Sequence, residues 1–415
     1  MRLLITLYQF LIPSRTREIL RVYKNIFKNQ ASKLGLFTVN VLYSPLALSL
    51  RGCGFIFPDF QYLNRIGHLA SEPDMFLKEA YLDGRHYSHP VLLIKNSIAN
   101  ASLATYWEKY YLVIKNKTLV KVLKPLLRHP LTRYETKKYV VAMNQTAQAF
   151  SIQSRWGDQD PLLRISSNHE KEGRLILRDL GLEPDRWHVC IHARTPHYSP
   201  GDEHYNNFRN FDFEDFLLVI HWIHDHGGIS IRMGDSGMNP INKIPGLIDY
   251  ATSNLKKDWL DIYLAGSCRF FLGSASGLYN VASVFGKPVA AVNMAPLSMV
   301  LPLAKGDIGI PKLYRDRESG RLLGFDEIIS MGAANYRFSD EFIAAGIRLE
   351  SNSPEDILDL VVEQYNRTEG TFFVSEENYH LQNQFTGLFK NGDYCYGSSA
   401  HIGSAFLRKY KDLLK

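Results

Sequence analysis

The second half of the chain alternates short apolar runs with longer amphipathic segments. WHVCIHAR, ISIRMGD, CRFFL and PVAAVN have the length of buried strands, and FEDFLLVIHWIHDHGG and DWLDIYLAGS have the length of helices. This spacing predicts a parallel sheet with right-handed crossovers. Ser353 and Pro354, followed by two acids, predict the start of a further helix.

The first half of the chain shows a similar alternation of strand-length and helix-length segments. GFIFPDF, HPVLLIKN and YLVIK predict three strands, and SIANASLATYWEKY predicts a helix. RIGHLASEPDMFLKEAYL reads as a loop and then a helix that begins after Gly67-His68, and the polar segment 145–170 reads as an irregular link. The expected divisions are a basic apolar segment, two α/β domains and C-terminal helices, over residues 1–50, 51–165, 166–350 and 351–415.

Between CRFFL and the predicted helix SGLYNVASVFG stands a turn made only of small residues, Gly273–Gly277. Such a strand-to-helix turn points free N–H groups and a positive helix end at an anion. Ser274, Ser276 and the Gly277 N–H would form a phosphate cradle. A tight turn selected only for packing would use the same residue types.

Polar residues recur just past the predicted strand ends, where ligands of open parallel sheets bind. These candidate ligand-binding residues are His192, Arg194, Arg232, Gly234, Asp235, Asp249, Ser274, Ser276, Gly277 and Asn293. Arg194 would grip a pyrophosphate with two donors, or else pair with Asp235. Asp235 would accept hydrogen bonds from a ribose or base, or else close a turn.

In the first half, His68, Glu72 and Asp74 are candidates for a general base that takes a proton from a hydroxyl. The alternative is that both acids cap a helix start. Asp158-Gln159-Asp160 resembles a metal-binding triplet but lacks a strand before it, and His221, His224 and His226 end an amphipathic helix. We therefore predict no metal and no cofactor.

Composition and charge limit the number of domains, the cellular compartment and the class of binding partner that the sequence predicts. The 415 residues favour two domains, and four dispersed cysteines favour a reducing cytoplasm over disulfides or structural zinc. No apolar run is long enough to span a membrane, and no cleavage site marks a signal peptide. Much of the net charge of +6 lies in residues 1–34, and residues 109–138 are also basic and apolar. This pattern suits an anionic membrane surface or a solvated helix face, and no motif points to nucleic acid.

RIGHLASEPDMFL, VCIHAR, ISIRMGD, IDYATS, the segment Asp261–Asn293 and the terminal IGSAFLRKY together resemble bacterial glycosyltransferases encoded with surface-polysaccharide genes. More distantly, His192-x-Arg194 and FFLGSASG resemble the donor half of fucosyltransferase-like GT-B enzymes. The resemblance implies an α/β, GT-B-like fold with two Rossmann-type domains facing a central cleft. Residues 51–165 would then bind the acceptor and residues 166–350 the nucleotide sugar.

The sequence thus predicts a metal-independent glycosyltransferase of cell-surface polysaccharide biosynthesis. Its partners would be a nucleotide sugar and a glycan or lipid-linked acceptor, and it would lie in the cytoplasm, peripheral to the inner face of the membrane. In this interpretation Arg194 stabilises the departing diphosphate. A nucleotide-sugar epimerase or hydrolase of the same architecture, and a non-catalytic sugar-nucleotide-binding protein, are the alternatives.

Overall fold

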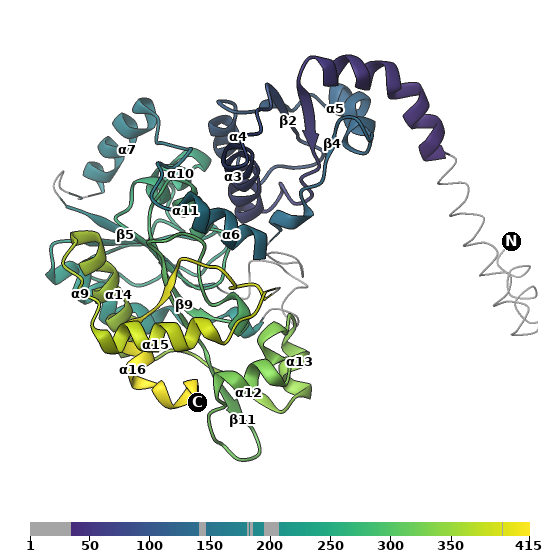
Figure 1. Cartoon of the computed structure of the whole chain (residues 1–415). Helices are drawn as coiled ribbons and strands as arrows, with labels where there is room; N and C mark the ends of the chain where they lie inside the picture. The colour runs from purple at the N-terminus through teal and green to yellow at the C-terminus, as the bar shows by residue number, and fades with distance from the viewer. Residues whose placement is uncertain (1–34, 141–146, 181, 183–185, 195–206, 392) are drawn as a thin grey trace, which may run out of the picture. The chain divides into compact units, whose positions relative to one another are not determined.

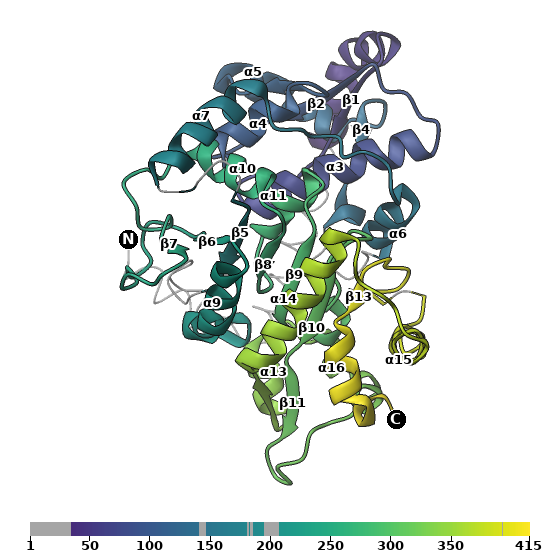
Figure 2. The ribbon, with the colours of Figure 1, turned by 90° about the vertical axis from the view of Figure 1, so that its left-hand side faces the viewer.

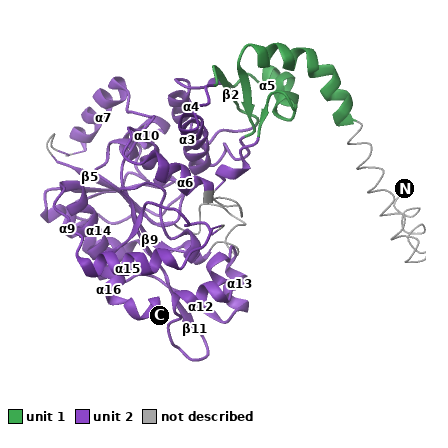
Figure 3. Cartoon of the chain, viewed as in Figure 1, with its two compact units in different colours: residues 1–59, 87–95, 114–134 green, residues 60–86, 96–113, 135–415 purple. Residues whose placement is uncertain are grey.

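The computed structural model describes residues 35–140, 147–180, 182, 186–194, 207–391 and 393–415 (Figure 1). These residues form two compact units, which Figure 3 distinguishes by colour. Unit 1 comprises residues 1–59, 87–95 and 114–134, and unit 2 comprises residues 60–86, 96–113 and 135–415. The domain limits inferred from sequence stay a prediction.

A four-stranded sheet has the order β3-β2-β1-β4. Its strands are β1 (Phe55–Pro58), β2 (His89–Leu93), β3 (Leu112–Ile114) and β4 (Arg133–Tyr134), and β1 pairs in parallel with β2 and β4. The three strands predicted in the first half are therefore confirmed. Within unit 1, Phe57 and Val91 from the sheet pack with Leu126 and with Ala47 of the helix at residues 35–52.

Unit 2 contains a seven-stranded sheet of order β13-β10-β9-β8-β5-β6-β7, and every pair of neighbours is parallel. The strands are β5 (His188–His192), β6 (Ile229–Arg232), β7 (Leu247–Ile248), β8 (Phe271–Gly273), β9 (Val289–Met294), β10 (Ile308–Pro311) and β13 (His401–Ile402). From β5 the chain winds outward through β6 and β7, then returns and winds the other way through β8, β9 and β10. This is the Rossmann strand order, whose ligands bind beside the carboxyl ends at the switch between β5 and β8. Parallel sheets in both parts confirm the α/β class and are consistent with a GT-B-like fold.

Helices cover the large sheet (Figure 2). α9 (Leu217–Asp225) packs on β6 and on α14 (Pro354–Glu369), which also contacts β9 and β10. α11 (Tyr279–Val284) packs on β8, β9 and α10 (Asp258–Ser267). Ser353 Oγ accepts a hydrogen bond from Asp356 N at 3.2 Å, so the helix start predicted at Ser353 is confirmed.

The other helices are α4 (Ala101–Trp107), α5 (Lys117–Leu123), α6 (Ala147–Trp156), α7 (Ser167–Asp179), α12 (Phe325–Ser330), α13 (Ser339–Ala344), α15 (Glu376–Gly387) and α16 (Ser404–Lys409). β11 (Leu313–Asp316) and β12 (Ile347–Glu350) form a separate antiparallel pair. Because α6 and the start of α7 lie in segment 145–170, the prediction of an irregular link there was wrong. Among the described residues, no helix is long and apolar enough to cross a membrane.

Helix α3 (Ile66–Leu82) begins earlier than predicted and runs through Pro73. Proline lacks the N–H that would bond to the carbonyl of Leu69, four residues earlier, and this defect often breaks a helix. Here Trp107 Nε1 donates to Leu69 O at 2.9 Å, and Tyr111 Oη donates to Pro73 O at 2.8 Å. The carbonyl of Leu69 therefore has a hydrogen-bond donor, which comes from α4. Because α3 begins at Ile66, the prediction that the helix begins after His68 was wrong.

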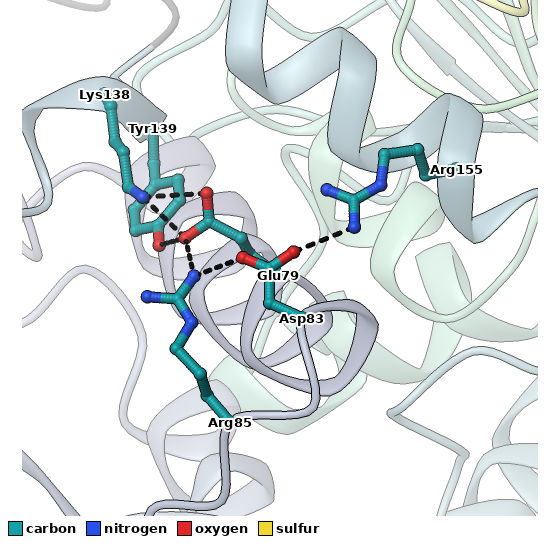
Figure 4. A network of polar contacts seen from close by, with 6 residues as sticks. All are labelled: Glu79, Asp83, Arg85, Lys138, Tyr139 and Arg155. Carbon is teal, nitrogen blue, oxygen red and sulfur yellow. Dashed lines mark hydrogen bonds and ion pairs between the residues drawn. The ribbon is translucent and has the colours of Figure 1, made fainter.

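A polar network fixes the C-terminal end of α3 (Figure 4). Glu79 accepts hydrogen bonds from Lys138 and from Tyr139 Oη, both in the short 3₁₀ helix η2 (Lys137–Tyr139). Asp83 accepts one from Arg155 of α6 at 2.8 Å. α3 is thus held in place at its C-terminal end by contacts with η2 and α6.

Candidate functional site

The first turn of α3 lies directly against the turn between β8 and α11. A Cβ atom built on Gly67 would lie 2.6 Å from Gly277 Cα, and one built on Gly277 would lie 2.7 Å from Gly67 N. Real Cβ atoms essentially never approach another atom this closely. The two backbones are therefore in contact, which requires glycine at both positions.

Several N–H groups at this contact have no acceptor among the residues that the structure describes. Arg65 at the N-cap of α3 makes no side-chain capping bond, and the first turn holds no acid. Within the described ranges, the N–H groups of Ile66, Gly67 and His68 donate no hydrogen bond, nor do those of Ser276 and Gly277. Helix starts carry partial positive charge, so bringing α3 and this turn together favours a bound anion.

Two side chains extend this donor set. Ser274 is fully buried directly after β8, and its Oγ has no hydrogen-bond partner in the part of the chain that the structure describes. Arg209, in the 3₁₀ helix η4 (Asn207–Arg209), donates to Ala275 O within the turn. Its charge also acts on Tyr279, whose pKa burial nevertheless raises to about 12. Arg209 was missed by sequence reasoning, because no motif or strand end surrounds it.

Lys312 anchors the segment that carries Arg209. It follows the carboxyl end of β10, and its Nζ donates to Asn210 O at 2.9 Å and to Ser351 Oγ at 3.3 Å. Burial lowers the pKa of Lys312 to about 8, against the opposing charges of Asp215 and Asp212. A sequence signal existed, since Lys312 directly follows an apolar run.

His192 ends β5 opposite Gly273, and half-buried Arg194 follows two residues later. Burial lowers the pKa of His192 to about 4; Asp235 opposes this shift, whereas Arg194 and Arg232 add to it. The ring is therefore neutral at pH 7, and its Nδ1 has no partner among the described residues.

Two of the residues predicted to bind the nucleotide sugar form an ion pair with each other. Buried Arg232 Nη1 donates to Asp249 Oδ1 at 3.0 Å and to Oδ2 at 3.1 Å. Asp249 also accepts hydrogen bonds from Ile241 N and from Thr252 Oγ1. This pair ties the end of β6 to the segment after β7. A role for Arg232 and Asp249 in binding the nucleotide-sugar donor stays a prediction.

Other predicted residues also hold loops at this edge of the sheet. Asp235 Oδ1 accepts from Gly237 N at 2.8 Å, which closes a turn. Asn293 and Asn352 exchange two backbone-to-side-chain hydrogen bonds of 2.6 and 2.7 Å. A Cβ on Gly234 would collide with Met238 Sδ. Donor binding by Gly234, Asp235 and Asn293 likewise stays a prediction.

The three candidate bases on α3 separate into two environments. His68 Nδ1 lies 2.7 Å from Glu72 Oε1, and Glu72 is fully buried whereas 18% of the His68 side chain is exposed. Asp74 instead pairs with buried Lys78 at 2.8 Å and accepts from Gln153 Nε2. Burial raises the pKa of Asp74, and Lys78 opposes the shift. The structure therefore joins His68 to Glu72 and places Asp74 in a separate ion pair.

The two motifs set aside as metal sites have ordinary contacts. Asp158 pairs with Lys305, Asp160 pairs with Arg164, and the His226 ring stacks on Trp222. Among the described residues, no group of three His, Cys, Asp or Glu side chains is placed to hold a metal. Metal independence stays a prediction.

No protein-family model matches the sequence, and no curated protein matches it. Among solved structures, the chain is similar to the glycosyl transferase family 9 protein of Veillonella parvula, with 11% sequence identity and a TM-score of 0.35. The alignment covers 57% of this chain and 79% of that chain. At this level of similarity, the function has to be inferred from the site alone.

Proposed function

We propose that this protein is a glycosyltransferase that moves a sugar from a nucleotide-sugar donor to a glycan or glycolipid acceptor. The observation that carries the proposal is the contact of Gly67 with Gly277, which brings together two sets of N–H groups that have no acceptor in the described part of the chain. A diphosphate offers several acceptor oxygens and negative charge, both of which suit such donors. The Rossmann strand order puts this turn beside the switch between β5 and β8, where nucleotides bind in such sheets.

The diphosphate gains negative charge as the glycosidic bond breaks. Arg209 and the N–H groups of Ser276 and Gly277 would stabilise that charge more strongly in the transition state than in the bound donor. Arg194, at the same edge of the sheet, would bind a further phosphate oxygen and keep its charge throughout turnover. This chemistry requires neither a metal nor a cofactor.

The acceptor hydroxyl must lose a proton as it attacks the sugar. With Glu72 Oε1 accepting from Nδ1–H, His68 presents Nε2 as the proton acceptor. Glu72 then orients the ring and stabilises the imidazolium that forms. Asp74, already paired with Lys78, takes no part in this step.

A panel of nucleotide sugars, with and without lipid-linked and glycan acceptors, tests this function. Acceptor-dependent release of a nucleoside diphosphate is the expected result, and Arg194→Ala should abolish it. Conversion of the donor sugar without acceptor would instead identify an epimerase or hydrolase. Tight donor binding without turnover on any acceptor would favour a non-catalytic binding protein. The resemblance to surface-polysaccharide enzymes makes polysaccharide precursors the first acceptors to test.

A further inference from the structure

The helix at residues 35–52 in unit 1 exposes an unusual number of apolar side chains. Phe37 is 66% exposed, Leu42 is 72% exposed and Leu48 is 60% exposed. Leu36, Val39, Val41 and Leu46 are exposed as well, and residues 35–50 contain no charge. Single exposed apolar residues are common, but a run of this length marks an interaction surface.

Helix α5 of the same unit adds to this apolar surface. Leu119 and Val122 of α5 are 45% and 47% exposed. Tyr43 Oη donates to Val122 O at 2.8 Å, so the helix at 35–52 and α5 are neighbours. We call the exposed apolar residues of these two helices the apolar patch of unit 1.

Charge identifies the partner of this patch. The described part of unit 1 holds eight Lys and Arg residues and one acid, Asp59, which pairs with Lys95 at 2.9 Å. Lys117, Lys121 and Lys124 on and beside α5 are exposed, as is Arg128. The preceding residues 1–34 contain seven further Lys and Arg residues and one Glu.

We propose that the apolar patch of unit 1 and the lysines of α5 dock this protein on the surface of an anionic phospholipid bilayer. Apolar side chains would enter the boundary between headgroups and acyl chains, while the lysines contact lipid phosphates. A second copy of the chain is disfavoured, because it would bring two strongly basic surfaces together. Nucleic acid is also disfavoured, because it leaves the aliphatic side chains in water.

Sedimentation of the full-length protein with vesicles tests this proposal. We expect binding to vesicles of phosphatidylcholine with phosphatidylglycerol, little binding to phosphatidylcholine alone, and strong weakening between about 0.1 and 1 M salt. Neutralising three lysines in Lys117→Gln/Lys121→Gln/Lys124→Gln should weaken binding by up to roughly a hundredfold. Phe37→Glu/Leu42→Glu should weaken it at least about tenfold.

Matched changes in unit 2 provide the controls. Lys171, Arg178 and Lys390 are exposed, and changing all three to Gln lowers the net charge as much as the triple lysine change in α5 does. Ile343 and Phe373 are exposed apolar residues, and changing both to Glu is the control for the Phe37→Glu/Leu42→Glu variant. These variants should bind as the wild type does, and thermal melting verifies that every variant is folded.

Equal binding to both vesicle types would overturn the proposal. So would unchanged binding by the Phe37→Glu/Leu42→Glu variant, which would assign any lipid affinity to other residues. Self-association of the wild type that this variant abolishes would show that the patch joins two copies of the chain.

Discussion

Gly67 and Gly277 lie 210 positions apart in the sequence, yet the backbone of one occupies the space that a side chain on the other would need. This contact brings the first turn of α3 onto the turn that follows β8. Because no side chain of the described residues accepts from the N–H groups of residues 66–68, 276 and 277, the contact creates a local excess of hydrogen-bond donors. An anion at this point would accept hydrogen bonds from these donors and would be favoured by the positive end of α3.

Substituting either glycine should therefore affect both stability and ligand binding. Gly277→Ala places a methyl group against Gly67 N, and forced overpacking of this kind costs about 1–3 kcal/mol of unfolding free energy. We expect it to weaken binding of nucleoside diphosphates at least about tenfold, measured by isothermal titration calorimetry. Gly387→Ala is the matched control, because open space surrounds Gly387. If the Gly277→Ala protein binds nucleoside diphosphates with wild-type affinity, the turn at Gly277 does not contribute to the ligand site.

Arg209 should contribute to binding through its charge. Because it touches the Ser274–Gly277 turn, Arg209→Ala should weaken binding of nucleoside diphosphates by roughly 10- to 100-fold, as the loss of a charge-assisted hydrogen bond predicts. Arg178→Ala, at an exposed position on α7, should leave the dissociation constant unchanged. If both variants bind equally well, Arg209 lies outside the site.

The His68–Glu72 pair should govern turnover rather than donor binding. His68→Gln should lower kcat by about 10²- to 10⁴-fold, the range typical of a lost general base, with donor affinity retained. Glu72→Gln should lower kcat less, because the ring keeps a hydrogen-bond partner. A matched Glu377→Gln change, at an exposed position on α15, should alter neither kcat nor donor affinity. If a fall in affinity for the nucleotide-sugar donor accounts for the whole loss of activity, the His68–Glu72 pair acts in donor binding and not in proton transfer.

His188 should make the protein sensitive to acid. Burial lowers its folded-state pKa to about 4, with Lys287 adding to the shift and the Leu264 carbonyl and Glu170 opposing it. The unfolded chain therefore binds the proton first. The associated stability is complete above about pH 6.5 and is lost as the pH falls to about 4, by about 3 kcal/mol.

Urea unfolding of wild type and His188→Gln at pH 7.5, 5.5 and 4.5 measures this effect. The difference between the two proteins should shrink as the pH falls, because the other titrating groups are common to both. A difference that is independent of pH would show that His188 does not titrate in this range.

Pro73 and Trp107 should be energetically coupled. Trp107→Phe leaves the Leu69 carbonyl without its donor, which costs about 1–3 kcal/mol beyond the lost ring volume. In a Pro73→Ala background the backbone regains an N–H at this position that can bond to Leu69 O, so the same Trp107→Phe change should cost less. A double-mutant cycle by urea unfolding gives the coupling energy; strictly additive effects would contradict this explanation of how the helix tolerates its proline.

Local signals in the sequence were sufficient for much of the large sheet. The apolar runs after Trp187 and before Gly273 became β5 and β8, and Ser353 caps α14 as its spacing with Pro354 predicts. These features depend on neighbouring residues alone. The start of α3 was placed too late, after His68 instead of at Ile66, and the donor that satisfies the Leu69 carbonyl opposite Pro73 comes from Trp107 in another helix.

The candidate site was only partly predictable for the same reason. The Ser274–Gly277 turn is recognisable by its small residues, but its contact with Gly67 depends on tertiary packing. Arg232 ends β6 and Asp249 follows β7, and no local pattern says that they pair with each other. Arg209 carries no motif at all, since its partner is a backbone carbonyl 66 positions away.

Hydrogen–deuterium exchange with and without a saturating nucleoside diphosphate tests the central claim most directly. We predict slower exchange at the amides of residues 66–68 and 276–277 together, because one anion would accept hydrogen bonds from both segments. Saturated binding that leaves both segments unprotected, or that protects only a distant part of the chain, would contradict the claim.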